Sequence, residues 1–131
     1  MDEKKIIEYM RKKRYIDGQY ICWDFVMEVV KDMYGIELPE YPVTEVQTEF
    51  KYKLLSNFAH IVVPRGEEQE GDIIVFSLFA NQHAGVVISK DNYIHLSREG
   101  VQVRDIASLL GNYKVYSSAI VTGKQIGRAH V

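Results

Sequence analysis

The sequence predicts one α+β domain, in which helices come first and an antiparallel sheet follows. Before residue 60 the apolar residues recur about every 3.6 positions, which is the period of a helix with one buried face. After residue 61 they gather in short runs separated by turn residues, which is typical of strands. A length of 131 residues suits a single domain with one core, and helices followed by strands indicate an α+β fold.

A short charged helix is expected over residues 2–14. Its apolar positions Ile6, Ile7 and Met10 form the face that we expect to be buried. The run of basic residues at 11–14 suits the end of a helix, where cations interact favourably with the helix dipole.

The second predicted helix carries the only cysteine of the chain and runs from Cys22 to about Tyr34. Turn residues at 17–19 precede it, and Gly35 suits its C-cap. Its apolar stripe consists of Phe25, Val26, Val29, Val30 and Met33. Cys22 is therefore expected at the helix N-terminus, where the dipole and the unpaired N–H groups favour a thiolate over a thiol.

A third helix is expected over residues 45–58, because Thr44 and Gln47 match a capping box. Beyond it the sequence predicts short strands joined by turns. The expected strands cover residues 61–63, 72–77, 83–89, 93–96, 101–103 and 113–121, with a short helical segment over 105–110.

Two neighbouring strands of this series carry His83 and His95. With a hairpin turn centred on Asp91, residues whose numbers sum to about 182 would pair, which sets His95 opposite Val87. The two histidines then share a face of the sheet but lie four residues, roughly 13 Å, apart along the strands. A shifted register, a bulge or a strong twist would be needed to bring them together.

A cysteine nucleophile needs a base within hydrogen-bond reach and a third group that fixes the tautomer of the base. Cys22 is the candidate nucleophile, and His60, His83 and His95 are the candidate partners. The alternative for Cys22 is a buried structural thiol, since free cysteines are among the most buried residues. The three histidines lack the spacing of the known zinc motifs, so no metal site and no cofactor are predicted.

Composition and charge narrow the class of protein. Apolar residues make up 47% and charged residues 26% of the chain, which is the balance of an ordinary globular protein. A net charge of −2 gives no electrostatic support for nucleic-acid binding. The first residues lack the apolar core of a signal peptide, and no apolar run reaches the length of a membrane span. We therefore expect synthesis in the cytoplasm without an export signal.

Four stretches, in order, resemble the NlpC/P60 cysteine peptidases. They are Cys-Trp-Asp-Phe-Val at 22–26, Tyr-Gly-Ile-Glu-Leu-Pro at 34–39, Gly-Asp-Ile-Ile-Val-Phe at 71–76, and His-Ala-Gly-Val-Val-Ile at 83–88 followed by Tyr-Ile-His at 93–95. The resemblance spans about residues 15–121. The Cys-Trp helix before a Gly-Ile-x-Leu-Pro segment is most similar to the branch of the family found in phage tail proteins.

The resemblance implies a papain-like core, with the N-terminal helices packed on the sheet, and a peptidase that cleaves peptidoglycan stem peptides. In the family the bond cut commonly joins D-glutamate to a diamino acid. Carried over, Cys22 is the nucleophile, His83 the general base and His95 the residue that orients the His83 ring. Tyr20 is positioned to line the site and to add a hydrogen-bond donor. The implied partners are the peptidoglycan peptide and phage tail proteins, and the implied location is the virion tail.

Two positions that we assign to substrate binding depart from the family pattern. Ile21 stands where the family usually has an aspartate that contacts the substrate's amine, and Asp24 stands where a small residue is usual. Asp24 either supplies the missing carboxylate from the next turn or stabilises the first turn of the helix. Two rivals to the peptidase follow: a thiol amidase or acyltransferase, and a catalytically silent structural or wall-binding module.

The last six residues, 126–131, resemble the translation of a sequencing-adapter read-through. We expect them not to be native and leave them, with His130, out of the site. The single domain is accordingly assigned to residues 1–125.

Overall fold

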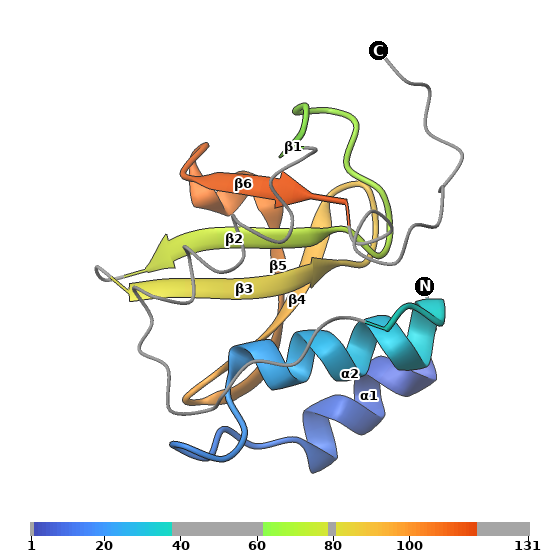
Figure 1. Cartoon of the computed structure of the whole chain (residues 1–131), viewed down its shortest axis with the longest axis vertical. Coiled ribbons are helices and arrows are strands. Elements are labelled where there is room, and N and C mark those ends of the chain that lie inside the picture. The colour runs from blue at the N-terminus through green and yellow to red at the C-terminus, as the bar shows by residue number, and fades with distance from the viewer. Residues whose placement is uncertain (1, 38–61, 79–80, 118–131) are drawn as a thin grey trace.

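A computed structural model of the chain describes residues 2–37, 62–78 and 81–117. Within these ranges it contains two α-helices that lie against one six-stranded antiparallel sheet (Figure 1), which confirms the α+β class. The expected helix over 45–58, residues 118–121 of the expected last strand, and the 126–131 tail lie outside the described residues. No helix in the described ranges is long and apolar enough to cross a membrane.

The first helix, α1 (Glu3–Lys12), forms where the sequence predicts it but buries a different face. Ile6 is buried as expected, whereas Ile7 and Met10 are 52% and 44% exposed, so the predicted stripe is wrong at these two positions. Tyr9 is buried in their place, because its ring packs edge-on against Phe25 at a centroid distance of 5.6 Å. A tyrosine thus supplies the contact that the sequence assigned to aliphatic residues.

The second helix, α2 (Cys22–Tyr34), has the predicted bounds. Gly35 follows it in the left-handed conformation, with φ of 65°, and its N–H donates to the Lys31 carbonyl. Its buried face is the predicted apolar stripe, except that Met33 is only partly buried, together with the first two residues of the helix. The buried residues are Cys22, Trp23, Phe25, Val26, Val29 and Val30.

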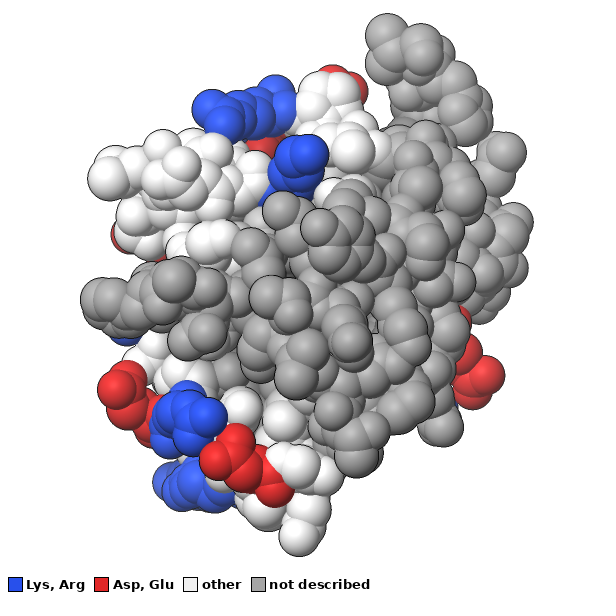
Figure 2. Space-filling model, turned by 60° about the vertical axis from the view of Figure 1, so that its left-hand side comes forward, with Lys and Arg blue, Asp and Glu red and all other residues white. Residues whose placement is uncertain are grey.

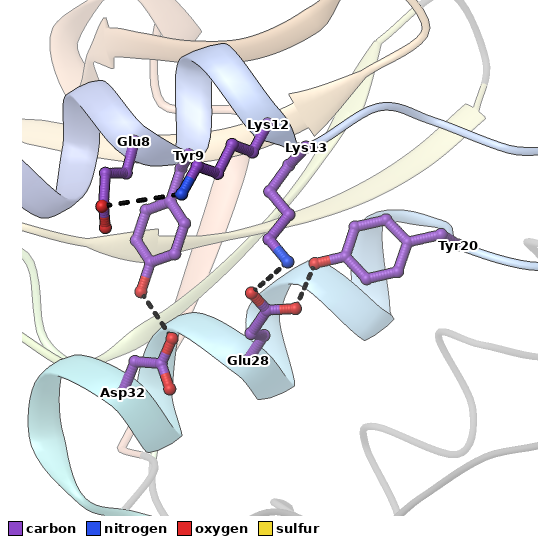
Figure 3. A network of polar contacts seen from close by, with 7 residues as sticks. All are labelled: Glu8, Tyr9, Lys12, Lys13, Tyr20, Glu28 and Asp32. Atoms are coloured by element: carbon purple, nitrogen blue, oxygen red, sulfur yellow. Dashed lines mark hydrogen bonds and ion pairs between the residues drawn. The ribbon is translucent and has the colours of Figure 1, made fainter.

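Polar side chains join the two helices and the segment between them (Figure 3). The Tyr9 hydroxyl donates to the Asp32 carboxylate at 3.1 Å. Glu28 binds both Lys13, at 2.6 Å, and the Tyr20 hydroxyl, at 2.8 Å. Because Lys13 and Tyr20 stand at the two ends of the connecting segment, this network fixes the path of the chain into Cys22.

The strands follow the predicted order along the chain. They are β1 (Val62–Val63), β2 (Ile73–Leu78), β3 (Asn81–Val87), β4 (Asn92–Ser97), β5 (Gly100–Asp105) and β6 (Tyr113–Tyr116), with a short 3-10 helix η1 (Ile106–Leu109) before β6. Their order across the sheet is β1-β6-β2-β3-β4-β5. α2 covers one face of the sheet, and η1 packs with a second apolar cluster on the other.

The hairpin between β3 and β4 has a register two residues away from the expected one. Gly85 pairs with His95 and Val87 with Tyr93, so that paired residue numbers sum to 180 rather than 182. The reason is Asn92, which joins the strand instead of the turn because its carbonyl accepts the N–H of Ile88 at 3.0 Å. The shift places His95 two residues, not four, from the position opposite His83.

Candidate active site

A cavity of about 540 Å³ lies beside the N-terminus of α2. It brings together the three residues to which the sequence assigns catalysis, each from a different element. The described residues that line it include Cys22 from α2, His83 from β3, His95 from β4, Gln102 and Arg104 from β5, and Tyr15 from the segment before α2.

Cys22 is the first residue of α2, and its side chain is 2% exposed. Backbone N–H groups of Ala84, Trp23 and Cys22 itself favour the thiolate, but burial outweighs them and raises the pKa of the Cys22 thiol to about 11. The expectation that the helix terminus makes the thiolate form more easily is therefore wrong for this chain. The bond from Ala84, the residue after His83, also places the sulfur next to β3.

His83 and His95 lie on the same face of the sheet, with ring centroids 6.5 Å apart and planes at 85°. Phe76, which is paired with His83 across β2 and β3, stacks on the His83 ring at 5.6 Å and meets the His95 ring edge-on at 5.4 Å. Phe76 thus packs against both imidazoles. The sequence pattern marks Phe76 only as part of an apolar strand.

Burial keeps both imidazoles neutral at neutral pH. Burial lowers the pKa of His83 below its ordinary value of 6.5. Burial, with added repulsion from His83 and Arg104, lowers the pKa of His95 to about 4. The resting pair in this cavity is a thiol beside a neutral imidazole rather than a thiolate beside an imidazolium.

The position opposite His95 requires glycine. A Cβ atom added at Gly85 would lie 2.6 Å from the Ile94 carbonyl oxygen and 3.1 Å from the His95 Cβ. Gln102, which pairs with His95 across β4 and β5, is a hydrogen-bonding side chain that acts on the His95 ring and partly offsets the lowering of its pKa, whereas no hydrogen bond joins His95 to His83 among the described residues. The orienting role of His95 toward His83 therefore stays a prediction.

The three residues assigned to substrate binding lie next to the site but not on the described lining of the cavity. The Tyr20 hydroxyl donates to Glu28, on the side of α2 that faces α1 (Figure 3). The Ile21 N–H donates to the Asp24 carboxylate at 2.9 Å. This bond favours the helix-stabilising interpretation of Asp24, because the carboxylate satisfies a backbone donor at the helix start. Substrate contacts by Tyr20, Ile21 and Asp24 stay predictions.

Sequence reasoning missed the side of the cavity that β5 provides. Gln102 and Arg104 line it, and their polar side chains alternate with Val101 and Val103 along the strand. That alternation was the available signal, because it puts both polar side chains on one face. Arg98, in the turn before β5, also lines the cavity; it pairs with Asp17 at 3.2 Å.

Metal-ligating side chains give no further site in the described part of the chain. On the face shown in Figure 2, acidic and basic side chains lie next to one another along the lower edge. No group of three or more metal-ligating side chains occurs among the described residues. His60, the third candidate partner of Cys22, lies outside them.

Cys22 is expected to react slowly with iodoacetamide at neutral pH. Because burial disfavours the thiolate, the alkylation rate of the folded protein should rise about tenfold per pH unit and level off near pH 11. The same protein unfolded in urea serves as the control and should level off near the free-cysteine value of about 8.5. A plateau of the folded protein below pH 8.5 would contradict the buried neutral thiol.

His95 should make the fold sensitive to acid. Above pH 6.5 the side chain is neutral in both the folded and unfolded states. As the pH falls, the unfolded chain takes up the proton first, and the folded chain does so only near pH 4. The free energy of unfolding should therefore decrease by about 3 kcal/mol between pH 6.5 and 4.

Urea unfolding of the wild type and His95→Leu at pH 7 and pH 4.5 measures this contribution. The difference in unfolding free energy between the two proteins isolates His95 from the carboxylates that also titrate. Between pH 7 and pH 4.5 the unfolding free energy of the wild type should fall by more than that of His95→Leu. A difference that does not change with pH would show that His95 is accessible to protons in the folded state.

A cysteine at the start of a helix and a histidine on a neighbouring strand thus border one cavity in this chain. The model of the NlpC/P60 family matches residues 11–118 of the chain. No curated protein matches the chain. The family implies a cysteine peptidase or amidase of cell-wall peptidoglycan. With a match over most of its length, the chain belongs to the NlpC/P60 family.

Proposed function

We propose that this chain is a cysteine peptidase that hydrolyses a peptide bond in peptidoglycan stem peptides. The observation that carries the proposal is the shared cavity: the only cysteine of the chain begins α2 and borders the same space as His83 and His95. A nucleophile, a base and a second imidazole in one cavity are the parts that thiol-dependent acyl transfer needs.

In the proposed mechanism, Cys22 is not ionised before the substrate binds. His83 takes the thiol proton as the sulfur attacks the scissile carbonyl, which a neutral imidazole is able to do. The backbone N–H of Cys22, which lies in the first turn of the helix and has no carbonyl partner within it, donates to the oxyanion. His83 then gives the proton to the leaving amine, and a thioester remains on Cys22. Water, deprotonated by His83, hydrolyses the thioester and restores the thiol.

A catalytically silent wall-binding module is the second candidate, and one observation favours it. Burial raises the pKa of Cys22 to about 11, and no hydrogen bond joins Cys22 to His83 within the described residues. A thiol amidase or acyltransferase would use the same residues on another acyl acceptor. The products, rather than the geometry, separate these activities.

Digestion of purified peptidoglycan, followed by mass spectrometry of the released peptides, tests the proposal. The wild type should release stem-peptide fragments whose summed mass exceeds that of the uncleaved peptide by one water for each bond cut. Cys22→Ala should release none while keeping its circular dichroism spectrum. Products joined to an added amine indicate an acyltransferase instead. Binding to peptidoglycan without any product, by wild type and variant alike, would replace the peptidase with the wall-binding module.

We also propose that the chain is a component of a phage or prophage tail. The support is the sequence, in which Cys22-Trp23 and the Gly-Ile-x-Leu-Pro segment at 35–39 resemble that branch of the family. Mass spectrometry of purified tail particles should detect the chain at a fixed ratio to the major tail protein. Its absence from the particles would exclude this part of the proposal.

A further inference from the structure

Three polar side chains lie in a row across the sheet, on the face that borders the cavity. His95 is on β4, and the strands on its two sides carry His83, on β3, and Gln102, on β5. Gln102 is paired directly with His95, which puts their Cβ atoms about 5 Å apart. All three side chains line the cavity. The His95 ring is thus flanked by one hydrogen-bonding side chain on each side.

Both nitrogens of the His95 ring are buried away from solvent. Phe76 meets the ring edge-on at a centroid distance of 5.4 Å, and Tyr93 lies against it at 5.5 Å. A buried polar atom costs free energy unless it is hydrogen-bonded, so each ring nitrogen needs a partner when the site works. Among the described residues, the two polar side chains of the row, His83 and Gln102, are placed to serve one nitrogen each.

The position of a single proton decides what the His95 ring is able to do for His83. Burial lowers the pKa of His95 to about 4, so the ring is neutral at neutral pH and carries one N–H and one bare nitrogen. The hydrogen bond made by one nitrogen fixes which of the two bears the proton. To orient His83, His95 has to present its bare nitrogen to the His83 N–H. Its own N–H then needs an acceptor on the opposite side, where Gln102 lies.

The amide of Gln102 presents an acceptor, because Arg104 holds its oxygen in place. An amide side chain offers either an oxygen or an NH2 group, depending on how it is turned. Arg104 has only donors, and its Nε and Nη2 atoms bind the Gln102 Oε1 atom at 3.2 and 3.0 Å. Gln102 also raises the pKa of His95, as an acceptor of its N–H does, whereas burial, His83 and Arg104 lower it.

We propose that Gln102 is a positioning residue, whose amide oxygen accepts the N–H of His95 and thereby leaves the bare nitrogen of His95 for His83. This inference rests on the proposed function for the reaction in which His83 is the base, and it adds a residue that acts only through His95. Gln102 does not touch the reacting atoms.

Nitrogen NMR of the histidine rings tests this hydrogen bond without a substrate, because a protonated and a bare ring nitrogen have different ¹⁵N chemical shifts. The chain has four histidines, and the His95 signals are those that disappear in His95→Gln. The measurement is made at pH 8, where the wild-type ring is neutral. We expect the wild type to show one dominant tautomer of His95.

Two changes at Gln102 separate the loss of the oxygen from the loss of the side chain. Gln102→Leu keeps the bulk without an acceptor and should shift the ratio of the two His95 tautomers about tenfold. Gln102→Glu keeps an oxygen and should keep the wild-type tautomer. Its charge raises the pKa of His95 by about 1–3 pH units, which leaves the ring neutral at pH 8. Val103→Thr, on the opposite and partly exposed face of β5, is the matched control and should change nothing.

A tautomer ratio that Gln102→Leu leaves unchanged, or that Val103→Thr shifts equally, overturns the proposal. Loss of the wild-type tautomer in Gln102→Glu overturns it as well, because an acceptor would then be present without effect. A role of Gln102 in packing alone would not restore the tautomer in Gln102→Glu after it is lost in Gln102→Leu.

Hydrolysis of a stem peptide gives the second readout. Gln102→Leu should lower kcat about tenfold with KM unchanged, and Gln102→Glu should keep most of kcat. An active peptidase in which Gln102→Leu leaves kcat unchanged removes the positioning role and keeps the proposed function. A protein that hydrolyses no peptide, but whose His95 tautomer depends on Gln102, removes the peptidase and keeps the hydrogen bond.

Discussion

Replacing His83 by alanine is expected to lower kcat for peptide hydrolysis at pH 7 by about 10³-fold. The reason is the neutral thiol: with the Cys22 pKa at about 11, almost no thiolate exists at pH 7 unless a base removes the proton during attack. The measurement is the initial rate with saturating peptide, for the wild type and His83→Ala.

The pH dependence of the two hydrolysis rates tests whether His83 acts as the base. The wild-type rate should decline only when the pH falls below 6.5, because burial lowers the pKa of His83 and protonation removes the base. His83→Ala should instead gain activity about tenfold per pH unit toward pH 11, since hydroxide must then form the thiolate. Activity of His83→Ala equal to the wild type at pH 7 would show that another group is the base.

Replacing Phe76 by alanine is expected to destabilise the protein by about 3–5 kcal/mol. Phe76 is 2% exposed and packs against His83, His95 and, at a centroid distance of 5.1 Å, Tyr93. Its removal leaves a cavity beneath both imidazoles in addition to the lost apolar burial. Urea unfolding followed by circular dichroism measures the change.

Phe76→Leu is the matched control, because it keeps most of the buried volume but has no ring for the histidines. It should lose less than about 1.5 kcal/mol of stability and yet show a reduced kcat, since the His83 ring loses its stacked neighbour. A Phe76→Ala protein as stable as the wild type would mean that the Phe76 ring is not part of the core.

The elements of this fold follow from local patterns, whereas the contacts between them do not. The apolar period of α2 and the glycine after it give both of its ends correctly, because these signals lie within the helix itself. The buried face of α1 is wrong because it depends on a partner: the Tyr9 ring fits Phe25 while its hydroxyl reaches Asp32. A hydropathy pattern ranks Met10 above Tyr9 and has no information about Asp32.

The same difference between local patterns and contacts between elements applies to the site. The resemblance to the NlpC/P60 family assigns the site to Cys22, His83 and His95, and the structure brings these three residues to one cavity. The distance between the histidines depends on whether Asn92 ends the turn or begins the strand, and one backbone hydrogen bond decides this. The thiol pKa was missed for a related reason: the helix terminus is visible in the sequence, but the burial that outweighs it is tertiary.

Stepwise alkylation of the protein tests the central claim most directly, because Cys22 is the only cysteine in the chain. The fraction modified, read from the intact mass, is compared with the residual rate of stem-peptide hydrolysis in the same sample. We predict that activity decreases linearly and reaches zero at one modification per chain. A fully alkylated protein that still hydrolyses the peptide, or an unmodified protein that hydrolyses none, would contradict Cys22 as the nucleophile of a peptidase.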